Sequence, residues 1–287
     1  MRDDFCAFIL THGRPDNIRT LRSLELSGYT GKLFIVIDDE DPTGPEYKRL
    51  YGDRVLVFSK TEVGRYTDQY DNFKERRAIF WARNACWDLA AKVGCRYFIQ
   101  LDDDYTSFLY RKCGKRTEGQ EVDTYHGWTI RSLDRVLEAM VEFLEGTPSS
   151  TICMSQGGDH FGGASGNIDI RMKRKAMNSF VCDTRRPFLF RGRVNEDVNT
   201  YVSLGNVGKL FWTYMPVQLN QLQSQSNAGG MTDLYLDSGT YLKSFYTVMA
   251  APSCTTIRTM GRTDRRLHHH VNWRSAVPLV VPEELRK

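Results

Sequence analysis

Apolar runs alternate with amphipathic stretches over the first hundred residues of the chain. The runs that predict buried strands are residues 5–10, 32–41, 54–59 and 96–105. Between them, a helix capped by Asp16 is expected to stop at Gly28, and a longer helix from about residue 73 is expected to stop at Gly94. Strands that alternate with helices in this way predict an α/β fold with a parallel sheet.

The pattern is looser in the second half. An amphipathic helix is predicted over residues 133–144, with its end at Gly146. The other expected elements are a strand at 150–155, a Gly-rich loop at 156–167, a helix at 195–204, a strand at 209–217, a helix near 239–250 and a tail at 265–273. Repeats and obvious linkers are absent from the sequence, so we expect one composite domain over residues 1–287.

Composition is that of an ordinary globular protein, with 41% hydrophobic and 26% charged residues. The first apolar run is short and has no cleavage site after it, and no segment approaches the roughly 18 apolar residues of a membrane span. We therefore expect a cytoplasmic protein without a membrane partner. The seven cysteines are scattered without a C-x-x-C pair, which argues against a disulfide framework and a structural zinc site.

The net charge of +4 is mild, but basic residues cluster between positions 171 and 193. Eight Arg and Lys residues stand there against one Asp. They are Arg171, Lys173, Arg174, Lys175, Arg185, Arg186, Arg191 and Arg193. Such a segment suits a polyanion such as DNA, and a solvated basic face is the alternative explanation.

Three successive acids, Asp102, Asp103 and Asp104, directly follow the fourth apolar run. They are expected at the carboxyl edge of the sheet, where α/β proteins bind ligands. Alternate residues of an extended segment point the same way, so Asp102 and Asp104 could share a cation while Asp103 points elsewhere. Mg²⁺ and Mn²⁺ prefer oxygen ligands and often bridge carboxylates to phosphates. The alternative is an acidic, solvated turn.

A second acidic pair, Glu196 and Asp197, stands where a helix should begin, with Asn195 as its expected cap. The pair could simply complement the helix dipole, or Asp197 could take a proton from an acceptor hydroxyl. Three consecutive histidines, 268–270, could supply an imidazole to the same metal, and their spacing does not decide which one does.

These features together resemble the GT-A glycosyltransferase fold, a Rossmann-like α/β fold with a central, mostly parallel sheet flanked by helices. More closely, the chain resembles the TET/JBP-associated glycosyltransferases of bacteriophages, which act on 5-hydroxymethylpyrimidines in phage DNA. The matching strings are "ARNACWDLA", "QLDDDY", "SQGGDHFGG", "RKAMNSF", "GRVNEDVNTY" and "RLHHHVNW". The resemblance implies a nucleotide-sugar-binding half at about residues 1–105 and an acceptor-binding half at about 106–287.

The resemblance also implies residue roles. Those assigned to the UDP-sugar are Thr11, His12, Arg14, Asp38, Asp39, Arg83, Asn84, Asp102 and Asp103. Mn²⁺ or Mg²⁺ would be held by Asp102, Asp104 and a histidine, with His269 the first choice and His268 the next. Asp197 would be the base on the acceptor side, and Glu196 would contact the sugar or orient the site.

The expected function is transfer of a sugar from a UDP-sugar to the hydroxymethyl group of 5-hydroxymethylcytosine, or a related base, in double-stranded phage DNA. The basic segment would hold the DNA, and the enzyme would work in the cytoplasm of the infected bacterium. If Asp197 lies opposite the leaving group, the reaction inverts the anomeric centre. Two alternatives stay open: a GT-A enzyme acting on a polysaccharide or protein, and a non-enzymatic DNA-binding protein.

Overall fold

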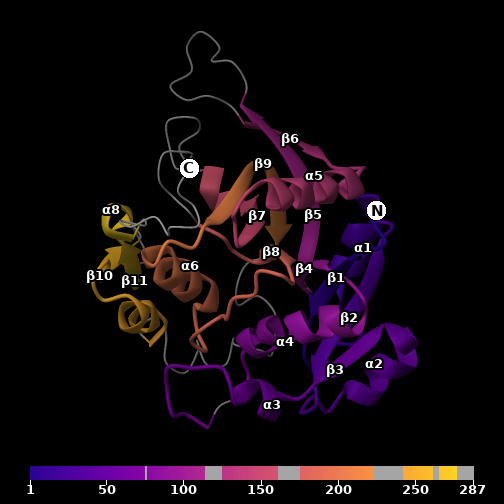
Figure 1. Ribbon diagram of the computed structural model, residues 1–287, viewed down its shortest axis with the longest axis horizontal. Coiled ribbons are helices and arrows are strands. Elements are labelled where there is room, and N and C mark those ends of the chain that lie inside the picture. The colour runs from indigo at the N-terminus through magenta and orange to yellow at the C-terminus, as the bar shows by residue number, and fades with distance from the viewer. Residues whose placement is uncertain (75, 114–124, 161–174, 223–241, 261–264, 277–287) are drawn as a thin grey trace.

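A mixed sheet with helices on both faces forms the centre of the protein (Figure 1). The computed structural model describes residues 1–74, 76–113, 125–160, 175–222, 242–260 and 265–276. Within this part of the chain the sheet has nine strands, in the order β3-β2-β1-β4-β8-β7-β9-β5-β6. The strands are β1 (Phe5–Leu10), β2 (Lys32–Asp38), β3 (Val55–Phe58), β4 (Tyr97–Asp102), β5 (Tyr105–Cys113), β6 (Tyr125–Thr129), β7 (Thr151–Gln156), β8 (Ser179–Asp183) and β9 (Phe211–Gln221).

The half of the sheet built from the start of the chain is parallel. β1 pairs in parallel with both β2 and β4, and β2 pairs in parallel with β3. The strands predicted from the apolar runs are all present, which confirms an α/β fold with a central sheet flanked by helices. Beyond β4 the pairing is mixed, because β8 runs antiparallel to both β4 and β7. The sequence did not predict β5, β6 or β8.

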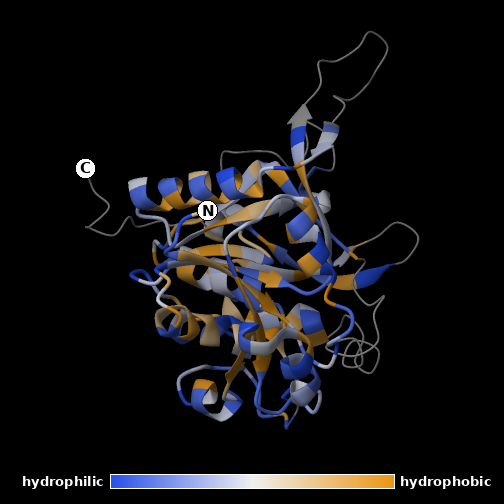
Figure 2. Ribbon diagram, turned by 90° about the vertical axis from the view of Figure 1, so that its right-hand side faces the viewer, coloured by the Kyte–Doolittle hydropathy of each residue, from blue (hydrophilic) through white to orange (hydrophobic). Residues whose placement is uncertain are grey.

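Two hydrophobic cores lie on opposite faces of the sheet. Successive side chains of a strand point to opposite faces, and β1 divides in this way: Phe8 belongs to one core and Ile9 to the other. Because both faces of β1 are covered, its sequence is a continuous apolar run. Figure 2 shows hydrophobic residues along the interior strands and hydrophilic residues on the outer sides of the helices.

The helices supply the outer layers of both cores. α4 and α6 pack on the face that Phe8 enters, and α1 and α5 pack on the face that Ile9 enters. The helices of eight or more residues are α1 (Arg19–Leu26), α2 (Gly44–Tyr51), α4 (Ile79–Lys92), α5 (Leu133–Gly146) and α6 (Glu196–Asn206). A short helix, α3 (Lys60–Gly64), follows β3.

Two predicted helix starts are wrong. α1 begins at Arg19 and has no side-chain cap, so Asp16 does not cap it. α4 begins at Ile79, six residues later than about residue 73. At the predicted start, the amide of Phe73 donates to the Asp71 carboxylate at 2.9 Å, and Asp71 is itself paired with Arg193 at 2.9 Å. A side chain that accepts from the backbone two residues on favours a turn over a helix.

A small C-terminal unit packs beside α6 (Figure 1). It contains a helix over residues 242–250, an antiparallel pair of β10 (Thr255–Met260) and β11 (Arg266–Val271), and the short α8 (Trp273–Ala276). The histidine run lies on β11. Among the described residues, no helix is long and apolar enough to cross a membrane.

We expect Gly28→Ala to destabilise the protein more than Gly94→Ala, as measured by urea unfolding. Both glycines follow helices and have positive φ, +77° and +68°, which costs an alanine about 1 to 2 kcal/mol. A Cβ at Gly28 would also lie 2.4 Å from the carbonyl oxygen of Arg131, whereas nothing lies within 4 Å at Gly94. The difference should be at least about 1 kcal/mol. Equal losses would show that the close approach to Arg131 relaxes freely.

Candidate functional site

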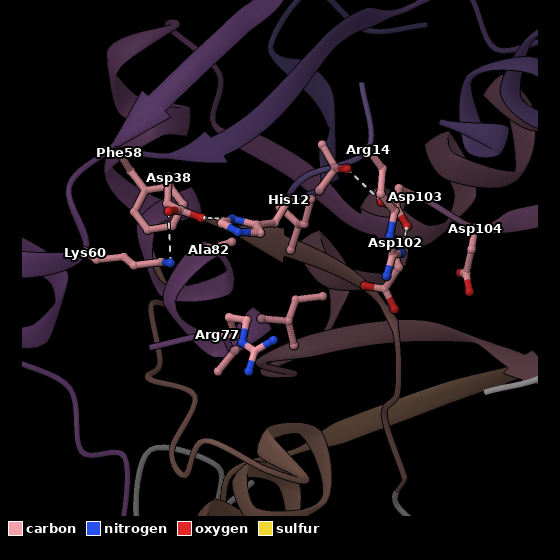
Figure 3. A pocket seen from close by; sticks show the side chains of 14 residues that line it. His12, Arg14, Asp38, Phe58, Lys60, Arg77, Ala82, Asp102, Asp103 and Asp104 are labelled. Carbon is pink, nitrogen blue, oxygen red and sulfur yellow. Dashed lines mark hydrogen bonds and ion pairs between the residues drawn. The ribbon is translucent and has the colours of Figure 1, made fainter. Parts of the chain in front are cut away.

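The carboxyl ends of β1, β2 and β4 meet at one edge of the sheet, where ligands of open α/β sheets bind. A cavity of about 260 Å³ opens there, and we call it the first cavity (Figure 3). Its walls combine charged side chains from the loops after these strands with apolar side chains near the start of α4. The lining residues are Leu10, Thr11, His12, Arg14, Asp38, Phe58, Lys60, Arg77, Ala78, Ile79, Ala82, Asp102, Asp103 and Asp104.

The loop after β1 is held in place by two residues that the sequence did not single out. Asp41 accepts a hydrogen bond from the amide of Gly13 at 2.8 Å. The hydroxyl oxygen of Tyr47 accepts one from the amide of Arg14 and lies 2.9 Å from Thr11 Oγ1. The side chains of Thr11 and Arg14 thereby face the first cavity.

Asp38, at the end of β2, is paired with a histidine and a lysine. His12 Nδ1 lies 2.7 Å from its carboxylate and Lys60 Nζ lies 2.9 Å away. The hydrogen bond to Asp38 raises the pKa of His12. Burial would raise the pKa of Asp38, but the hydrogen bonds from His12 and Lys60 hold it below its ordinary value. Lys60 is buried and was missed by the sequence analysis, although it directly follows the third apolar run.

Asp39 does not join this group. Its side chain is exposed, and its carboxylate accepts a hydrogen bond from the amide of Lys60 at 3.0 Å, outside the lining of the first cavity. The expected place of Asp39 in the nucleotide pocket is therefore wrong. Successive residues of an extended segment point in opposite directions, and Asp38 takes the inward position.

The three acids after β4 divide as the alternation of an extended segment predicts. Asp103 accepts hydrogen bonds from Thr11 at 2.7 Å and from Arg14 at 3.2 Å, whereas Asp102 and Asp104 point away from this pair (Figure 3). Burial, together with the nearby Asp104 and Glu196, raises the pKa of Asp102 to about 7 against the opposing effect of Arg83. Burial also raises the pKa of Asp104.

Asp102 and Asp104 fit a divalent cation in their chemistry. Two carboxylates whose ionised forms are disfavoured by burial and mutual repulsion are stabilised by a cation that prefers oxygen ligands. In the described part of the chain, however, no three His, Cys, Asp or Glu side chains are close enough to hold a metal ion. The predicted set of Asp102, Asp104 and His269 is therefore not brought together.

A second cavity, of about 650 Å³, adjoins the first and shares Ile79 and Asp102 with it. It lies between the sheet edge, the start of α6 and the C-terminal unit. The lining residues are Ile79, Arg83, Asp102, Gln156, Lys175, Met177, Asn178, Asn195, Glu196, Asp197, Val198, Tyr201, Gln221, Lys243, His268, His269, His270, Val271 and Trp273. The two cavities adjoin at Asp102, at the end of β4, and we call the pair the cleft.

Arg83 joins the two sides of this cleft. Its Nη2 donates to Asp102 at 3.0 Å and its Nε donates to Glu196 at 2.9 Å. The side chain is only 1% exposed and lies over the ring of Phe180, 5.0 Å from the ring centroid. Although burial opposes the charge, Asp102 and Glu196 hold the pKa of Arg83 above its ordinary value. Arg83 is thus a fixed cation at the junction of the cavities.

Asn84, the next residue of α4, is not available to a ligand. Its Nδ2 donates to the carbonyl of Phe190 and its Oδ1 accepts from the amide of Phe190, both at 2.9 Å. The side chain is buried and lines neither cavity. The predicted contact of Asn84 with the donor sugar is therefore wrong; Asn84 instead fastens the loop before α6 to α4.

Asp197 lines the second cavity and, unlike Asp102 and Glu196, forms no ion pair with Arg83. It accepts a hydrogen bond from the amide of Val198 at 2.7 Å. Burial and the neighbouring Glu196 raise the pKa of Asp197 to about 6. Glu196, by contrast, is tied to Arg83. A carboxylate with a pKa near neutrality and a cavity beside it has the properties of a general base.

The family model described as TET-Associated Glycosyltransferase matches residues 5–230, from β1 to beyond β9. The chain belongs to this family. It is accordingly a glycosyltransferase, an enzyme that transfers a sugar, which sets aside the non-enzymatic alternative. No curated protein matches the sequence. The family match ends before the C-terminal unit, which adds Lys243 and the histidines to the second cavity.

Solved structures resemble this glycosyltransferase only distantly. Glucosyl-3-phosphoglycerate synthase from Mycobacterium tuberculosis, in complex with Mn²⁺, UDP and phosphoglyceric acid, is 11% identical, with a TM-score of 0.44 over 96% of this chain and 88% of that chain. The same enzyme with Mn²⁺ and UDP-glucose is 10% identical, with the same TM-score and coverage. A mycobacterial protein is 10% identical, with a TM-score of 0.45 over 93% and 83% of the chains. Similarity this distant carries no argument about ligands.

The basic residues predicted to bind DNA, between positions 171 and 193, do not form one surface among the described residues of this glycosyltransferase. Arg171, Lys173 and Arg174 lie outside the described residues. Lys175 forms an ion pair with Asp159 and lines the second cavity. Arg185 and Arg191 are exposed.

Arg193 and Arg186 serve the structure instead. Arg193 is buried and paired with Asp71 at 2.9 Å, so its predicted contact with DNA is wrong. Arg186 donates to the carbonyls of Thr147 and Ser149.

Arg185 and Arg186 also lie at the wrong edge of the sheet for the cleft. Both follow Asp183, which pairs with Tyr97 at the start of β4, whereas the cleft lies at Asp102, at its end. At about 3.3 Å per residue the two ends are roughly 17 Å apart. The sequence analysis placed them with the rest of the segment because β8, which carries the chain away from the cleft, was not predicted.

We expect Arg83→Met to lower the free energy of unfolding by about 3 kcal/mol, because removal of one partner from a buried ion pair leaves the remaining charges uncompensated. Denaturant unfolding measures the change. The control is Arg49→Met, which removes an exposed pair with Glu46 and should leave the stability nearly unchanged. A loss below about 1 kcal/mol for Arg83→Met would contradict the bridging role of Arg83.

Proposed function

We propose that this glycosyltransferase uses a UDP-sugar and a divalent cation to modify the hydroxymethyl group of a 5-hydroxymethylpyrimidine in DNA. The observation that carries the proposal is the pair of adjoining cavities, one with charged side chains at the sheet edge and one with Asp197, that share Asp102. Such a cleft can bring a nucleotide-sugar and an acceptor together at the end of β4.

The donor belongs in the first cavity. Thr11, His12, Arg14 and Asp38, which line this cavity with the ring of Phe58, would surround the uridine. Asp102 and Asp104 would hold Mn²⁺ or Mg²⁺, and Asp103 keeps Arg14 in place. When bound, the cation neutralises charge on the departing diphosphate. Arg83 lines the second cavity and holds Asp102 in place between the two cavities.

The acceptor belongs in the second cavity. A hydroxyl group there can give its proton to Asp197, whose raised pKa makes it a stronger base than an ordinary aspartate. Glu196 stays bound to Arg83 and orients the site. With the base and the leaving group on opposite sides of the sugar, a single displacement inverts the anomeric centre.

DNA is the acceptor that the family resemblance favours. A 5-hydroxymethyl group lies in the major groove, and an enzyme can reach it there or flip the nucleotide into a pocket. Lys175 at the second cavity and Arg191 on the surface are the described residues of the basic segment that remain suited to phosphates. Activity on phage DNA would place the enzyme in the cytoplasm of the infected host. A saccharide or protein acceptor is the other outcome of the experiment below.

A transfer assay with two duplexes that differ only in the hydroxymethyl group tests the proposal. A panel of labelled UDP-sugars should label the modified duplex alone, because only that duplex carries an alcohol on the base. Excess EDTA should abolish labelling, and Mn²⁺ should restore it. Equal labelling of both duplexes, or transfer only to a saccharide or protein, would overturn the DNA assignment. Full activity in EDTA would overturn the proposal that the reaction needs a divalent cation.

Replacement of Asp197, the proposed general base, tests the acceptor side of the reaction. Asp197→Asn should bind UDP nearly normally but lower kcat by about 10² to 10⁴, because an amide keeps the shape and cannot accept a proton. The parental rate should fall as the pH decreases through about 6, where Asp197 becomes protonated. Asp88→Asn, an exposed change on α4, is the control. Parental kcat in Asp197→Asn would show that Asp197 is only a residue at the start of α6 and not the general base.

A further inference from the structure

Asn195 occupies an unusual position between the acidic pair and the C-terminal unit. It precedes α6, where a capping side chain was predicted, but its φ of 57° is left-handed and its side chain makes no capping hydrogen bond. The capping prediction is therefore wrong. Its Nδ2 instead lies 2.7 Å from the carbonyl oxygen of Lys243, 3.1 Å from Thr247 Oγ1 and 3.3 Å from His269 Nδ1.

The carbonyl of Lys243 fixes which way the Asn195 amide faces. A carbonyl oxygen can only accept a hydrogen bond, so the amide nitrogen of Asn195 must face it. The reverse orientation would set two oxygens against each other. The amide nitrogen of Asn195 donates and cannot accept a hydrogen bond. A proton on His269 Nδ1 would point at this nitrogen, so the contact at 3.3 Å requires that Nδ1 carry no proton.

The adjacent histidine has the opposite arrangement. His268 Nδ1 lies 2.6 Å from the carbonyl oxygen of His269 and must donate to it. The proton of neutral His268 is thus on Nδ1, and that of neutral His269 is on Nε2. Only an unprotonated nitrogen can bind a metal ion. Within the described residues, Nε2 of His269 has no protein partner, and the ring lines the second cavity.

We propose that His269 is a hydrogen-bond donor to a substrate oxygen in the second cavity, that Asn195 is the positioning residue that sets this role, and that His269 does not bind the cation. The proposal rests on the proposed function for the identity of the substrates. The oxygen belongs either to the diphosphate of the donor or to the hydroxyl of the acceptor, since both accept a hydrogen bond.

One further observation agrees with this role. His269 forms no cluster of three metal-ligating side chains with Asp102 and Asp104 in the described part of the chain. A donor in the same cavity as Asp197 can hold a substrate oxygen while Asp197 accepts the proton.

Two substitutions at one position separate a donor from a ligand. His269→Ala should lower kcat/KM by about 10- to 100-fold, the effect of a lost hydrogen bond to a charged or reacting oxygen. His269→Gln should recover most of that loss, because its amide also donates. Both variants should bind Mn²⁺ in the presence of UDP within about twofold of the parent, since a ligand would cost about 10-fold or more. Thr256→Val, an exposed change on β10, is the control and should alter neither quantity.

The source of the oxygen follows from binding measurements on the same variants. Weaker UDP binding by His269→Ala assigns it to the diphosphate, and a higher KM for DNA with unchanged UDP binding assigns it to the acceptor. A tenfold loss of Mn²⁺ affinity in His269→Gln would overturn the proposal, as would parental kcat/KM in His269→Ala.

The protonation state of the His269 ring can be measured without any substrate. A failure of this inference can therefore be distinguished from a failure of the proposed function. The ¹⁵N chemical shifts of the unliganded protein should show His269 protonated at Nε2 and His268 at Nδ1. Asn195→Gly, which removes the donor and tolerates the left-handed φ, should let the His269 proton populate Nδ1 as well, which a merely structural role would not do. A parental His269 protonated at Nδ1 would overturn the proposal, whether or not the enzyme uses UDP-sugars.

Discussion

A buried guanidinium held between two carboxylates is the constraint on which the site depends. Arg83 on α4 bonds Asp102 at the end of β4 and Glu196 at the start of α6. An isolated charge at this depth would be costly, and the carboxylates would repel each other without the cation. The arrangement is therefore stable only when α4, β4 and α6 are all in place, which joins the donor side of the cleft to the acceptor side.

Supporting contacts keep α6 where Arg83 requires it. Asn84 pairs with both backbone groups of Phe190, and Arg193 is buried against Asp71. Asn195 then ties the start of α6 to the C-terminal unit through Lys243. Each contact joins segments that are far apart in the sequence. Asn84, Arg193 and Asn195 thus help to fix the acidic pair at the start of α6, and none of the three is assigned a contact with a proposed substrate. Arg83 fixes the pair too, and it also lies beside the proposed substrates.

The sequence predicted the parts of the molecule that depend on local pattern. The buried strands of the parallel half, α5 and the acids after β4 follow from apolar runs and from what ends them. Thr11, His12, Arg14 and Asp38, which were expected to lie together, line one cavity because loops after parallel strands meet at one edge. β8 was missed because only three of its five residues are apolar, a run too short to distinguish a strand from a loop.

The errors concern side chains whose role is set by distant partners. Asn84 and Asn195 looked like a ligand contact and a helix cap, and each is instead committed to a backbone group more than forty residues away along the chain. Arg193 was predicted to be part of a basic surface, but it is buried and its charge is paired with Asp71. Lys60 could have been suspected from its place after a strand, but its pairing with Asp38 depends on the sheet order.

A double-mutant cycle between Arg83 and Glu196 measures the central constraint most directly. Unfolding free energies are compared for the parent, Arg83→Met, Glu196→Gln and the double variant. If the guanidinium joins the two halves of the cleft, the interaction energy should be about 2 kcal/mol or more, because the second substitution removes a charge that the first has left unpaired. Losses that add within about 0.5 kcal/mol would show that the two residues act independently and would contradict the account.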